Sequence, residues 1–209
     1  MLNRKGIVFV ISAPSGTGKT TICKAIVKEV ENIRFSISYT TRERKKGEID
    51  GVDYYFVSRE RFRELIDENF FVEWAEVYGN LYGTPWSELE RAREEGVDLL
   101  LEIDVQGGKN VKSVFPDSVL IFIVPPSLEE LRKRLEARGR DSDEEIERRI
   151  RLAKSEMEFM NFYDYIVEND KIENAIQKVK CIIDAERVKR ERVAEHYLEK
   201  IKPKGEKSE

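Results

Sequence analysis

Four short, mainly apolar runs are spread along the chain and predict the strands of its core. They are residues 7–11, 99–104, 119–124 and 165–167. Runs of this length are typical of strands that are buried on both faces of a parallel sheet. Between the runs, apolar residues recur at helical spacing, as at Ile22, Ala25, Ile26 and Val30. Strands that alternate with helices predict a parallel α/β core with helices on both faces of the sheet.

Two more helices are indicated after the third and fourth runs. Ser127 and Glu130 have the spacing of a capping box, which marks a helix start. The apolar residues that follow at helical spacing are Leu128, Leu131 and Leu135, and then Ile172, Ile176, Val179 and Ile183.

Three segments depart from this alternation. Residues 35–84 carry short apolar and aromatic runs, at 54–57, 70–78 and 81–82, and the turn signal Gly79-Asn80 predicts a hairpin in a small mixed-sheet insertion. Residues 136–151 are almost entirely charged. The charged tail 185–209 has a weak apolar stripe at Ala194, Tyr197, Leu198 and Ile201. Its last eight residues are expected to be disordered.

Composition narrows the class of protein. The 209 residues are 40% hydrophobic and 37% charged, with a formal net charge of -4. Proteins that bind a nucleic-acid backbone usually carry a strong basic excess, so no nucleic-acid partner is expected. Two cysteines and one histidine are too few for a disulfide framework or a His/Cys zinc cluster. His196 lies in the charged tail, which argues against Ser-His or Cys-His catalysis.

The apolar runs and the cysteine content also indicate where in the cell the protein is expected. No apolar run approaches the roughly 18 residues of a membrane span, so no membrane partner is expected. Residues 7–11 are too short for a signal peptide, and a glycine-rich loop follows them in place of a cleavage site. We therefore expect a cytoplasmic protein with reduced thiols. Cys23 and Cys181 lie in helical apolar patterns, and both are predicted to be in the core.

A glycine-rich loop between the first strand and the first helix is the strongest motif. It runs Ala13-Pro14-Ser15-Gly16-Thr17-Gly18-Lys19-Thr20 and matches G-x-x-x-x-G-K-[ST], with alanine in place of the first glycine. In such a loop, backbone N–H groups hold phosphate oxygens, because they point inward at a helix N-terminus. Lys19 is expected to reach the β- and γ-phosphates, and the Thr20 hydroxyl to bind Mg²⁺.

An acid follows the second strand. Asp104 comes at the carboxyl end of that strand, where open parallel sheets bind ligands, and Glu102 lies two residues earlier on the same face. A carboxylate here can hold Mg²⁺ directly or through water. The alternative is that Asp104 caps a neighbouring helix.

Arginines gather in two places, and each set has two interpretations. The stretch 134–151 is either a solvated helix face with i,i+4 ion pairs or a mobile lid that brings Arg138 and Arg149 onto a transferring phosphoryl group. In the insertion, arginine forks and tyrosine hydroxyls suit a second phosphate, although the aromatic residues also suit an ordinary small core. The residues concerned there are Ser38, Arg42, Arg44, Lys45, Tyr54, Glu73, Tyr82 and Thr84.

Taken together, these motifs resemble the guanylate kinase family from about residue 5 to residue 188. The segments that carry the resemblance are 12–20, 38–42, 47–48, 51–54, 71–75, 82–84, 103–107, 134–135, 138–139 and Arg149. The resemblance implies a P-loop NTPase-type three-layer fold with a GMP-binding insertion and a helical lid. The implied divisions are core 1–34, 97–127 and 156–188, insertion 35–96, lid 128–155, and charged tail 189–209.

The resemblance also implies a function: Mg²⁺-dependent transfer of a phosphoryl group from ATP to GMP. The implied ATP-binding residues are the loop 13–20 with Ala13, Pro14, Ser15, Gly16, Thr17, Gly18, Lys19 and Thr20, then Thr21, Arg134, Arg138 and Asn169. The implied GMP-binding residues are Ser38, Arg42, Lys45, Tyr54, Glu73, Tyr82, Thr84 and Asp104. The implied catalytic residues are Lys19, Arg42, Arg138 and Arg149, and the implied metal ligands are Thr20 and Asp104.

Within this resemblance, Glu73 accepts from guanine N1–H and the 2-amino group, while Ser38 and Thr84 donate toward O6. One departure concerns the phosphate segment, where the family usually has Arg-x-Pro-Arg-x-Gly-Glu. This chain has Arg44 at the proline position and Lys45 at the second arginine, and either of the two suits the second cation.

Two other functions and the oligomeric state stay open at this level. The chain is alternatively a P-loop kinase for another small phosphate acceptor, or a guanylate-kinase-like module that binds phosphorylated protein segments without catalysis. The intact loop and lid arginines argue against the second alternative. A homo-oligomer is possible, because the tail stripe can pack on a second subunit as well as on the core.

Overall fold

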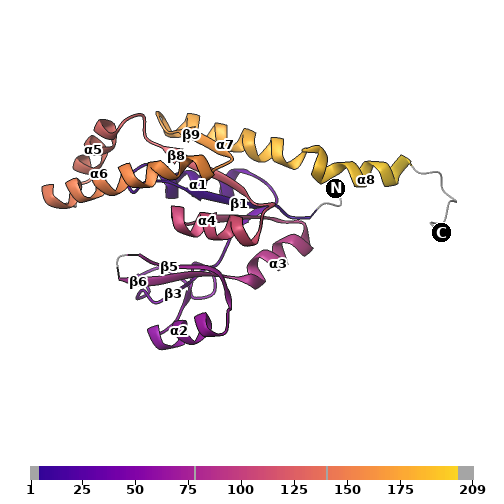
Figure 1. The fold of residues 1–209 in the computed structure, drawn as a ribbon, viewed down its shortest axis with the longest axis horizontal. Coiled ribbons are helices and arrows are strands. Elements are labelled where there is room, and N and C mark those ends of the chain that lie inside the picture. The colour runs from indigo at the N-terminus through magenta and orange to yellow at the C-terminus, as the bar shows by residue number, and fades with distance from the viewer. Residues whose placement is uncertain (1–4, 78, 140, 202–209) are drawn as a thin grey trace.

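The computed structural model describes residues 5–77, 79–139 and 141–201. Its main sheet has five parallel strands in the order β2-β7-β1-β8-β9 (Figure 1). Their bounds are β1 Val8–Ser12, β2 Ile33–Phe35, β7 Asp98–Glu102, β8 Val119–Val124 and β9 Tyr165–Glu168. All but β2 coincide closely with the four apolar runs, so the predicted parallel α/β core is confirmed.

Alternate side chains of β1 enter two cores on opposite faces of the sheet. Ile7, Phe9 and Ile11 pack with the buried residues of α1 (Lys19–Glu29) and α7 (Ile172–Arg187). Val8 and Val10 pack with α3 (Trp86–Glu95) and α4 (Val105–Val114). Because successive side chains of a strand point to opposite faces, an unbroken apolar run is what a sheet between two helical layers requires.

A second lobe holds a four-stranded mixed sheet, as the insertion pattern predicts. Its strand order is β4-β3-β6-β5, and β5 and β6 form the expected antiparallel hairpin. The bounds are β3 Tyr39–Thr40, β4 Tyr55–Phe56, β5 Phe71–Val77 and β6 Asn80–Pro85. The helix α2 (Arg59–Asp67) starts at Ser58, whose hydroxyl accepts from the N–H of Arg61, and it covers one face of this sheet.

Two helices form a third unit over the glycine-rich loop, and this unit is called the lid below. They are α5 (Leu128–Ala137) and α6 (Asp143–Met157), joined through their own small core of Leu131, Leu135, Ile146 and Ala153. The predicted cap is confirmed, because the Ser127 hydroxyl accepts from the N–H of Glu130 at 3.0 Å. A short 3-10 helix, η1 (Glu158–Phe162), leads from α6 back to β9.

The last helix, α8 (Arg190–Ile201), extends away from the sheet (Figure 1). Its predicted apolar stripe does not pack on the core, since Tyr197, Leu198 and Ile201 are 53%, 56% and 76% exposed. The prediction that both cysteines are buried is wrong for Cys181, which is exposed, whereas Cys23 is buried. On α7 the buried positions are Ala175, Val179, Ile183 and Glu186, and Cys181 lies on another side of the helix.

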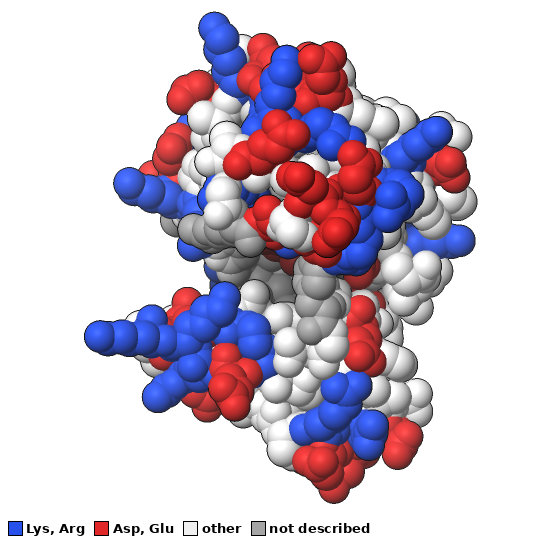
Figure 2. All heavy atoms as spheres, turned by 90° about the vertical axis from the view of Figure 1, so that its left-hand side faces the viewer, with Lys and Arg blue, Asp and Glu red and all other residues white. Residues whose placement is uncertain are grey.

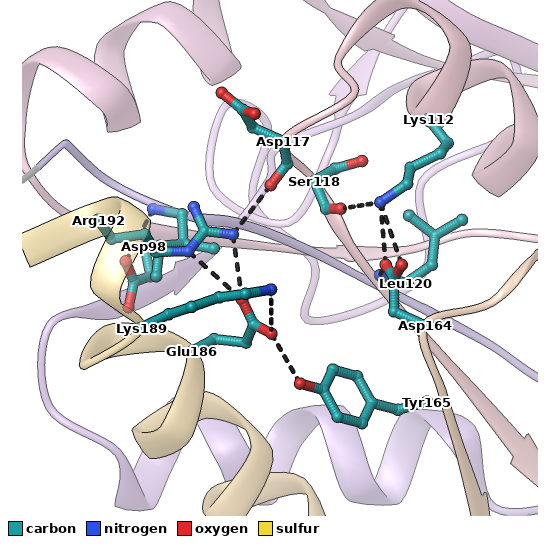
Figure 3. Close-up of polar contacts among 11 residues, drawn as sticks. Asp98, Lys112, Asp117, Ser118, Leu120, Asp164, Tyr165, Glu186, Lys189 and Arg192 are labelled. Carbon is teal, nitrogen blue, oxygen red and sulfur yellow. Dashed lines mark hydrogen bonds and ion pairs between the residues drawn. The ribbon is translucent and has the colours of Figure 1, made fainter.

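A polar network joins α8 to the amino-terminal ends of β8 and β9 (Figure 3). The buried carboxylate of Glu186 accepts from the Tyr165 hydroxyl at 2.7 Å and from Lys189 and Arg192 at 3.2–3.3 Å. A hollow of about 470 Å³ lies beside this network, on the opposite edge of the sheet from the glycine-rich loop. Its three lysine and arginine residues, Lys112, Lys189 and Arg192, all have acidic partners. We therefore assign the network to holding α8.

Some predictions fall outside the described residues. They are the disorder of residues 202–209, the last residue of the run 70–78, and Arg140 in the charged stretch. Among the helices that the structure describes, none is long and apolar enough to span a bilayer.

Candidate active site

The glycine-rich loop connects β1 to α1 across the carboxyl end of the parallel sheet. Gly16 and Gly18 have φ of +98° and +97°, a conformation that side chains with a Cβ rarely adopt. Gly18 is also the N-cap of α1, so the loop opens onto a helix N-terminus. Ala13 is buried in the core and is not among the described non-glycine residues with positive φ. The alanine at the first motif position is therefore accommodated without strain.

Lys19 and Thr20 begin α1 and face the end of β7. The Lys19 ammonium donates to the carbonyl of Ile103 at 2.9 Å. The Thr20 hydroxyl donates to the carboxylate of Glu102. These contacts hold both side chains at the mouth of the loop, on the side where a bound phosphate chain approaches the helix N-terminus.

The two strand-end acids have different surroundings. Asp104 is the N-cap of α4, and its carboxylate accepts from the N–H of Gly107 at 2.7 Å, as in the capping interpretation. Glu102 is the acid in contact with Thr20. The sequence indicated Glu102 only through its spacing from Asp104, because residues two apart in a strand share a face.

The side-chain oxygens of Thr20, Glu102 and Asp104 suit a small hard cation. Hydroxyl and carboxylate oxygens are the ligands of Mg²⁺, which usually keeps several waters and binds through few protein groups. Within the described part of the chain, no three His, Cys, Asp or Glu side chains gather as a metal cage.

The cleft-facing side of the small sheet carries the predicted acceptor residues. On β6, Leu81 packs toward α2, so Tyr82 and Thr84 point the opposite way. Glu73 on β5 pairs with Thr84, beside an irregularity between Phe71 and Glu73. The Thr84 hydroxyl donates to the Glu73 carboxylate at 2.6 Å. The Thr84 hydroxyl, which was predicted to donate a hydrogen bond to a base, donates to Glu73 in this structure.

Glu73 is a buried acid with few polar neighbours. It is 5% exposed. Burial raises the pKa of Glu73 to about 7, and the charge of Asp104 adds to the rise, while hydrogen bonds from Thr84 oppose it. A carboxylate held in this way can accept two hydrogen bonds from a ligand that enters the cleft.

Gly107 lies directly against Glu73. A Cβ added at Gly107 would be 2.8 Å from the Glu73 carboxylate and 3.4 Å from that of Asp104. This close approach brings the first turn of α4, in the main lobe, onto an acid of the small lobe. The sequence pattern did not single out this glycine as a site residue.

Arg42 forms a second cationic centre in the small lobe. Its guanidinium lies 5.4 Å from the ring of Tyr54, and the Tyr54 and Tyr82 rings are 6.1 Å apart. It forms a bidentate ion pair with Glu48, at 2.7 and 3.1 Å. The cluster brings Arg42, Tyr54 and Tyr82 together as predicted, whereas Lys45 and Arg44 are exposed on the same loop. Ser38 precedes β3 and is half-buried.

The lid arginines differ in their contacts with the loop. Arg149 on α6 donates to the Ser15 hydroxyl at 3.4 Å and pairs with Asp141 and Glu145 at 3.1 and 3.0 Å. Arg138 is exposed at the end of α5. Thr21 is exposed on α1, one residue beyond the motif. Arg149 therefore reaches the loop in this conformation.

Arg134 and Asn169 connect the lid to the other side of the loop. Arg134 donates to the carbonyls of Asn169 and Asp170 at 3.0 and 3.2 Å. The amide of Asn169 donates to the carbonyl of Thr17 at 2.6 Å. These bonds fix the loop that follows β9 beside the glycine-rich loop.

Glu156, near the end of α6, was not predicted as a site residue. Its Oε2 is buried and has no hydrogen-bond partner among the described residues. Burial raises the pKa of Glu156 to about 7, while the charge of Lys19 lowers it and that of Asp104 raises it. The lid therefore adds a carboxyl group to the neighbourhood of Lys19.

The two lobes and the lid surround an open cleft. Figure 2 shows a hollow between the upper and lower lobes, with blue lysine and arginine side chains at the rim of the lower one. The glycine-rich loop belongs to the upper lobe and Glu73 and Arg42 to the lower one. The glycine-rich loop and the Arg42 cluster thus lie on opposite sides of this hollow.

Comparisons with known proteins give the same result along nearly the whole chain. The family model described as guanylate kinase matches residues 5–186. The guanylate kinase of Halalkalibacterium halodurans is 48% identical over 197 residues, which cover 94% of this chain and 97% of that protein. The guanylate kinase of Geobacter metallireducens is 47% identical over 200 residues, covering 96% and 98%.

A solved structure agrees with these relatives. The crystal structure of guanylate kinase from Anaplasma phagocytophilum has a TM-score of 0.75 and 36% identity, and the match covers 96% of this chain and 97% of that one. The family match and the arrangement of loop, insertion and lid lead to one conclusion: this chain belongs to the guanylate kinase family.

Proposed function

We propose that this chain catalyses the transfer of the γ-phosphoryl group of ATP to GMP, which gives ADP and GDP. The observation that carries the proposal is the buried Glu73–Thr84 pair, in a lobe that also holds Arg42, Tyr54 and Tyr82 and that faces a glycine-rich phosphate loop. Together with family membership, this arrangement supports a base-reading site and a phosphate site for one acceptor nucleotide.

In the proposed reaction a phosphate oxygen of GMP attacks the γ-phosphorus of ATP. The new P–O bond forms as the bond from the γ-phosphorus to the bridging oxygen breaks, and ADP leaves. The second pKa of a phosphate monoester is about 6, so most of the GMP is a dianion at neutral pH and needs no protein base. The protein instead positions two polyanions and neutralises their charge.

Most of the predicted site residues receive a role in this proposal. Loop N–H groups and Lys19 bind the ATP phosphates, and Arg134 and Asn169 support the adenine side. Arg42, Tyr54, Tyr82 and either Lys45 or Arg44 bind the GMP phosphate. Arg149, and Arg138 once the lid closes, neutralise the phosphoryl group in transfer. Thr20 with Glu102 or Asp104 would hold Mg²⁺, which would supply positive charge to neutralise the phosphate groups.

Selectivity for guanine follows from Glu73. Guanine offers N1–H and a 2-amino group, which match two acceptor positions of a carboxylate. Adenine has an unprotonated N1 and no 2-amino group, so a buried Glu73 would be left unpaired. Sites built on such hydrogen bonds reject the wrong ligand by on the order of 10⁴-fold.

We also propose a cytoplasmic enzyme of purine nucleotide metabolism, with ATP and GMP rather than nucleic acid or a membrane as its partners.

The direct test is Mg²⁺-dependent formation of ADP from ATP with GMP, AMP, UMP and dTMP offered separately. We expect strong turnover with GMP and little with the other three. Turnover with a different acceptor would keep the reaction class and refute the specificity. Binding of GMP without turnover would favour a non-catalytic binding module.

Gly107→Ala is expected to raise the KM for GMP by roughly 10- to 100-fold and to leave the KM for ATP within about threefold. The added methyl group takes the position that the Glu73 carboxylate now approaches, so the acceptor of guanine N1–H must move. Gln106→Ala, on the exposed side of the same helix turn, is the matched control. Equal KM values for GMP in both variants would show that the close approach is not needed.

Guanosine binding is expected to depend on pH through Glu73. The free site has a pKa of about 7, and the bound base requires the ionised carboxylate, so binding must remove a proton below that pH. Affinity should therefore rise about tenfold per pH unit up to pH 7 and then level off. Guanosine is used because it lacks the titrating phosphate. Inhibition by guanosine between pH 5.5 and 8 measures this, and Glu73→Gln should abolish the dependence.

A further inference from the structure

Glu48 is the acid that ends the basic loop 42–48, beside the proposed phosphate site of the acceptor. The loop 42–48 carries four cations, Arg42, Arg44, Lys45 and Lys46, and one other acid, Glu43. An acid among four cations weakens the attraction of the loop for a phosphate, because opposite charges at this distance partly cancel. The contacts of the Glu48 carboxylate give a physical reason for an acid at this position.

The Glu48 carboxylate binds the side chain of Arg42 with both oxygens. Arg42 Nη2 donates to Oε1 at 2.7 Å, and Nη1 donates to Oε2 at 3.1 Å and to the carbonyl of Glu43 at 2.7 Å. These bonds use three of the five N–H groups of the guanidinium. The two side chains are only 17% and 21% exposed, so the pair is shielded from water.

The same carboxylate also holds the backbone of Lys45. Glu48 Oε2 accepts from the N–H of Lys45 at 2.7 Å, and the N–H of Glu48 donates to the carbonyl of Lys45 at 3.1 Å. These two bonds close a tight turn through Gly47, whose φ is +93°. One acid thus joins the guanidinium of Arg42 to the backbone of the residue at the second cation position.

The contacts with Glu48 and with the Glu43 carbonyl hold the Arg42 guanidinium in one orientation. With Glu48 on one edge and the carbonyl of Glu43 beside it, Arg42 remains stacked near Tyr54 and Phe56, at 5.4 and 5.7 Å from their ring centres. A free arginine loses much rotamer freedom when it binds an anion. A guanidinium that is already held in place loses less, so its affinity for a phosphate is higher.

We propose that Glu48 is a positioning residue, which holds Arg42 and the Lys45 turn in the geometry that binds the phosphate of the acceptor nucleotide. This inference rests on the proposed function. The hydrogen bonds from Arg42 and from the Lys45 N–H lower the pKa of Glu48, in keeping with an acid that stays ionised in this role. Glu48 acts through Arg42 and needs no contact with the substrate.

The test is Glu48→Gln, with Glu43→Gln as the matched control. Both variants remove one negative charge from the same loop, but Glu43 is exposed and binds Arg42 only through its backbone carbonyl. The measurements are the KM for GMP, the KM for ATP, kcat, and the inhibition constant of guanosine. Guanosine has the base without the phosphate, so it separates the two halves of the acceptor site.

For Glu48→Gln we expect the KM for GMP to rise about tenfold, with the guanosine constant and the KM for ATP within about twofold of the wild type. Glu43→Gln should change none of them by more than about twofold. Should Glu48→Gln not fold, Glu48→Asp takes its place, and a rise in the KM for GMP of at least threefold is expected.

Four results would overturn the inference. A lower KM for GMP would mean that Glu48 competes with the phosphate for Arg42. An equal loss of GMP and guanosine binding would mean that Glu48 only maintains the fold of the lobe. An unchanged KM for GMP, in a wild-type background that phosphorylates GMP, would refute the inference alone. A wild-type protein without GMP turnover would refute the proposed function and the inference together.

Discussion

Lys19→Ala is expected to lower kcat by about 10³-fold with GMP and with any weaker acceptor. The ammonium lies at the N-terminus of α1 and is held by the carbonyl of Ile103 at 2.9 Å, next to the phosphate loop. It therefore supplies a fixed positive charge where charge develops on the transferring phosphoryl group. Because that charge is needed with every acceptor, the GMP to AMP ratio of kcat/KM should stay within about threefold of the wild type.

The control for this substitution is Lys24→Ala. Lys24 lies on the same helix and is exposed, so its removal changes net charge and helix composition equally. Circular dichroism and thermal unfolding establish that both variants fold. A loss in kcat of less than tenfold for Lys19→Ala, with Lys24→Ala unchanged, would exclude Lys19 from the phosphoryl-transfer step.

Glu73→Gln is expected to lower the ratio of kcat/KM for GMP over AMP by at least 10²-fold. The amide keeps the shape of the side chain and one acceptor oxygen, but it presents an N–H₂ group where guanine also has donors. One hydrogen bond is lost and the other loses its charged acceptor; a hydrogen bond to a charged group is worth about 1.5–3 kcal/mol. Steady-state rates with the two nucleotides measure the ratio.

The control here is Glu76→Gln, three residues along β5 on its exposed side. Its partner Arg59 forms a surface ion pair, which contributes little. An unchanged GMP to AMP ratio in Glu73→Gln would refute the assignment of Glu73 to base recognition. A matching fall in both variants would assign the effect to the sheet in general.

The same Glu73→Gln variant should be more stable than the wild type at pH 8. The folded state raises the pKa of Glu73 from 4.5 to about 7, so the folded state binds its proton more tightly than the unfolded state does. The free energy of unfolding therefore falls as pH rises from about 4.5 to 7, by up to about 3 kcal/mol. Glutamine has no such dependence, so the stability gain should disappear at pH 5. Urea unfolding at the two pH values measures it.

One helix that the sequence pattern did not predict is α4 (Val105–Val114). In α4, Gly107 and Gly108 weaken the helix signal, because glycine has a low helix propensity. Added Cβ atoms at these two positions would lie 2.8 Å from Glu73 and from the Tyr163 hydroxyl, respectively. The glycines are therefore chosen for tertiary contacts that the local sequence does not reveal.

Helical periodicity was also not enough to decide which side of α7 or α8 packs against the rest of the protein. Helical periodicity correctly predicted α7, but the prediction that Cys181 lies on its buried side was wrong. Likewise, it identified the stripe of Tyr197, Leu198 and Ile201 without showing that this stripe faces away from the body. Which side of a helix is covered depends on where its neighbours lie.

By itself, the sequence determined the parallel α/β core, the glycine-rich loop, the small-sheet insertion and the residue types of both proposed phosphate sites. It could do so because strand burial, helix periodicity and the phosphate loop are set by residues close together in the chain. Only the tertiary structure decided that Glu102 rather than Asp104 touches Thr20, that Thr84 donates to Glu73, and that Glu48 holds Arg42. These contacts depend on side-chain direction and on the folding of separate segments onto one another, and no local pattern encodes either.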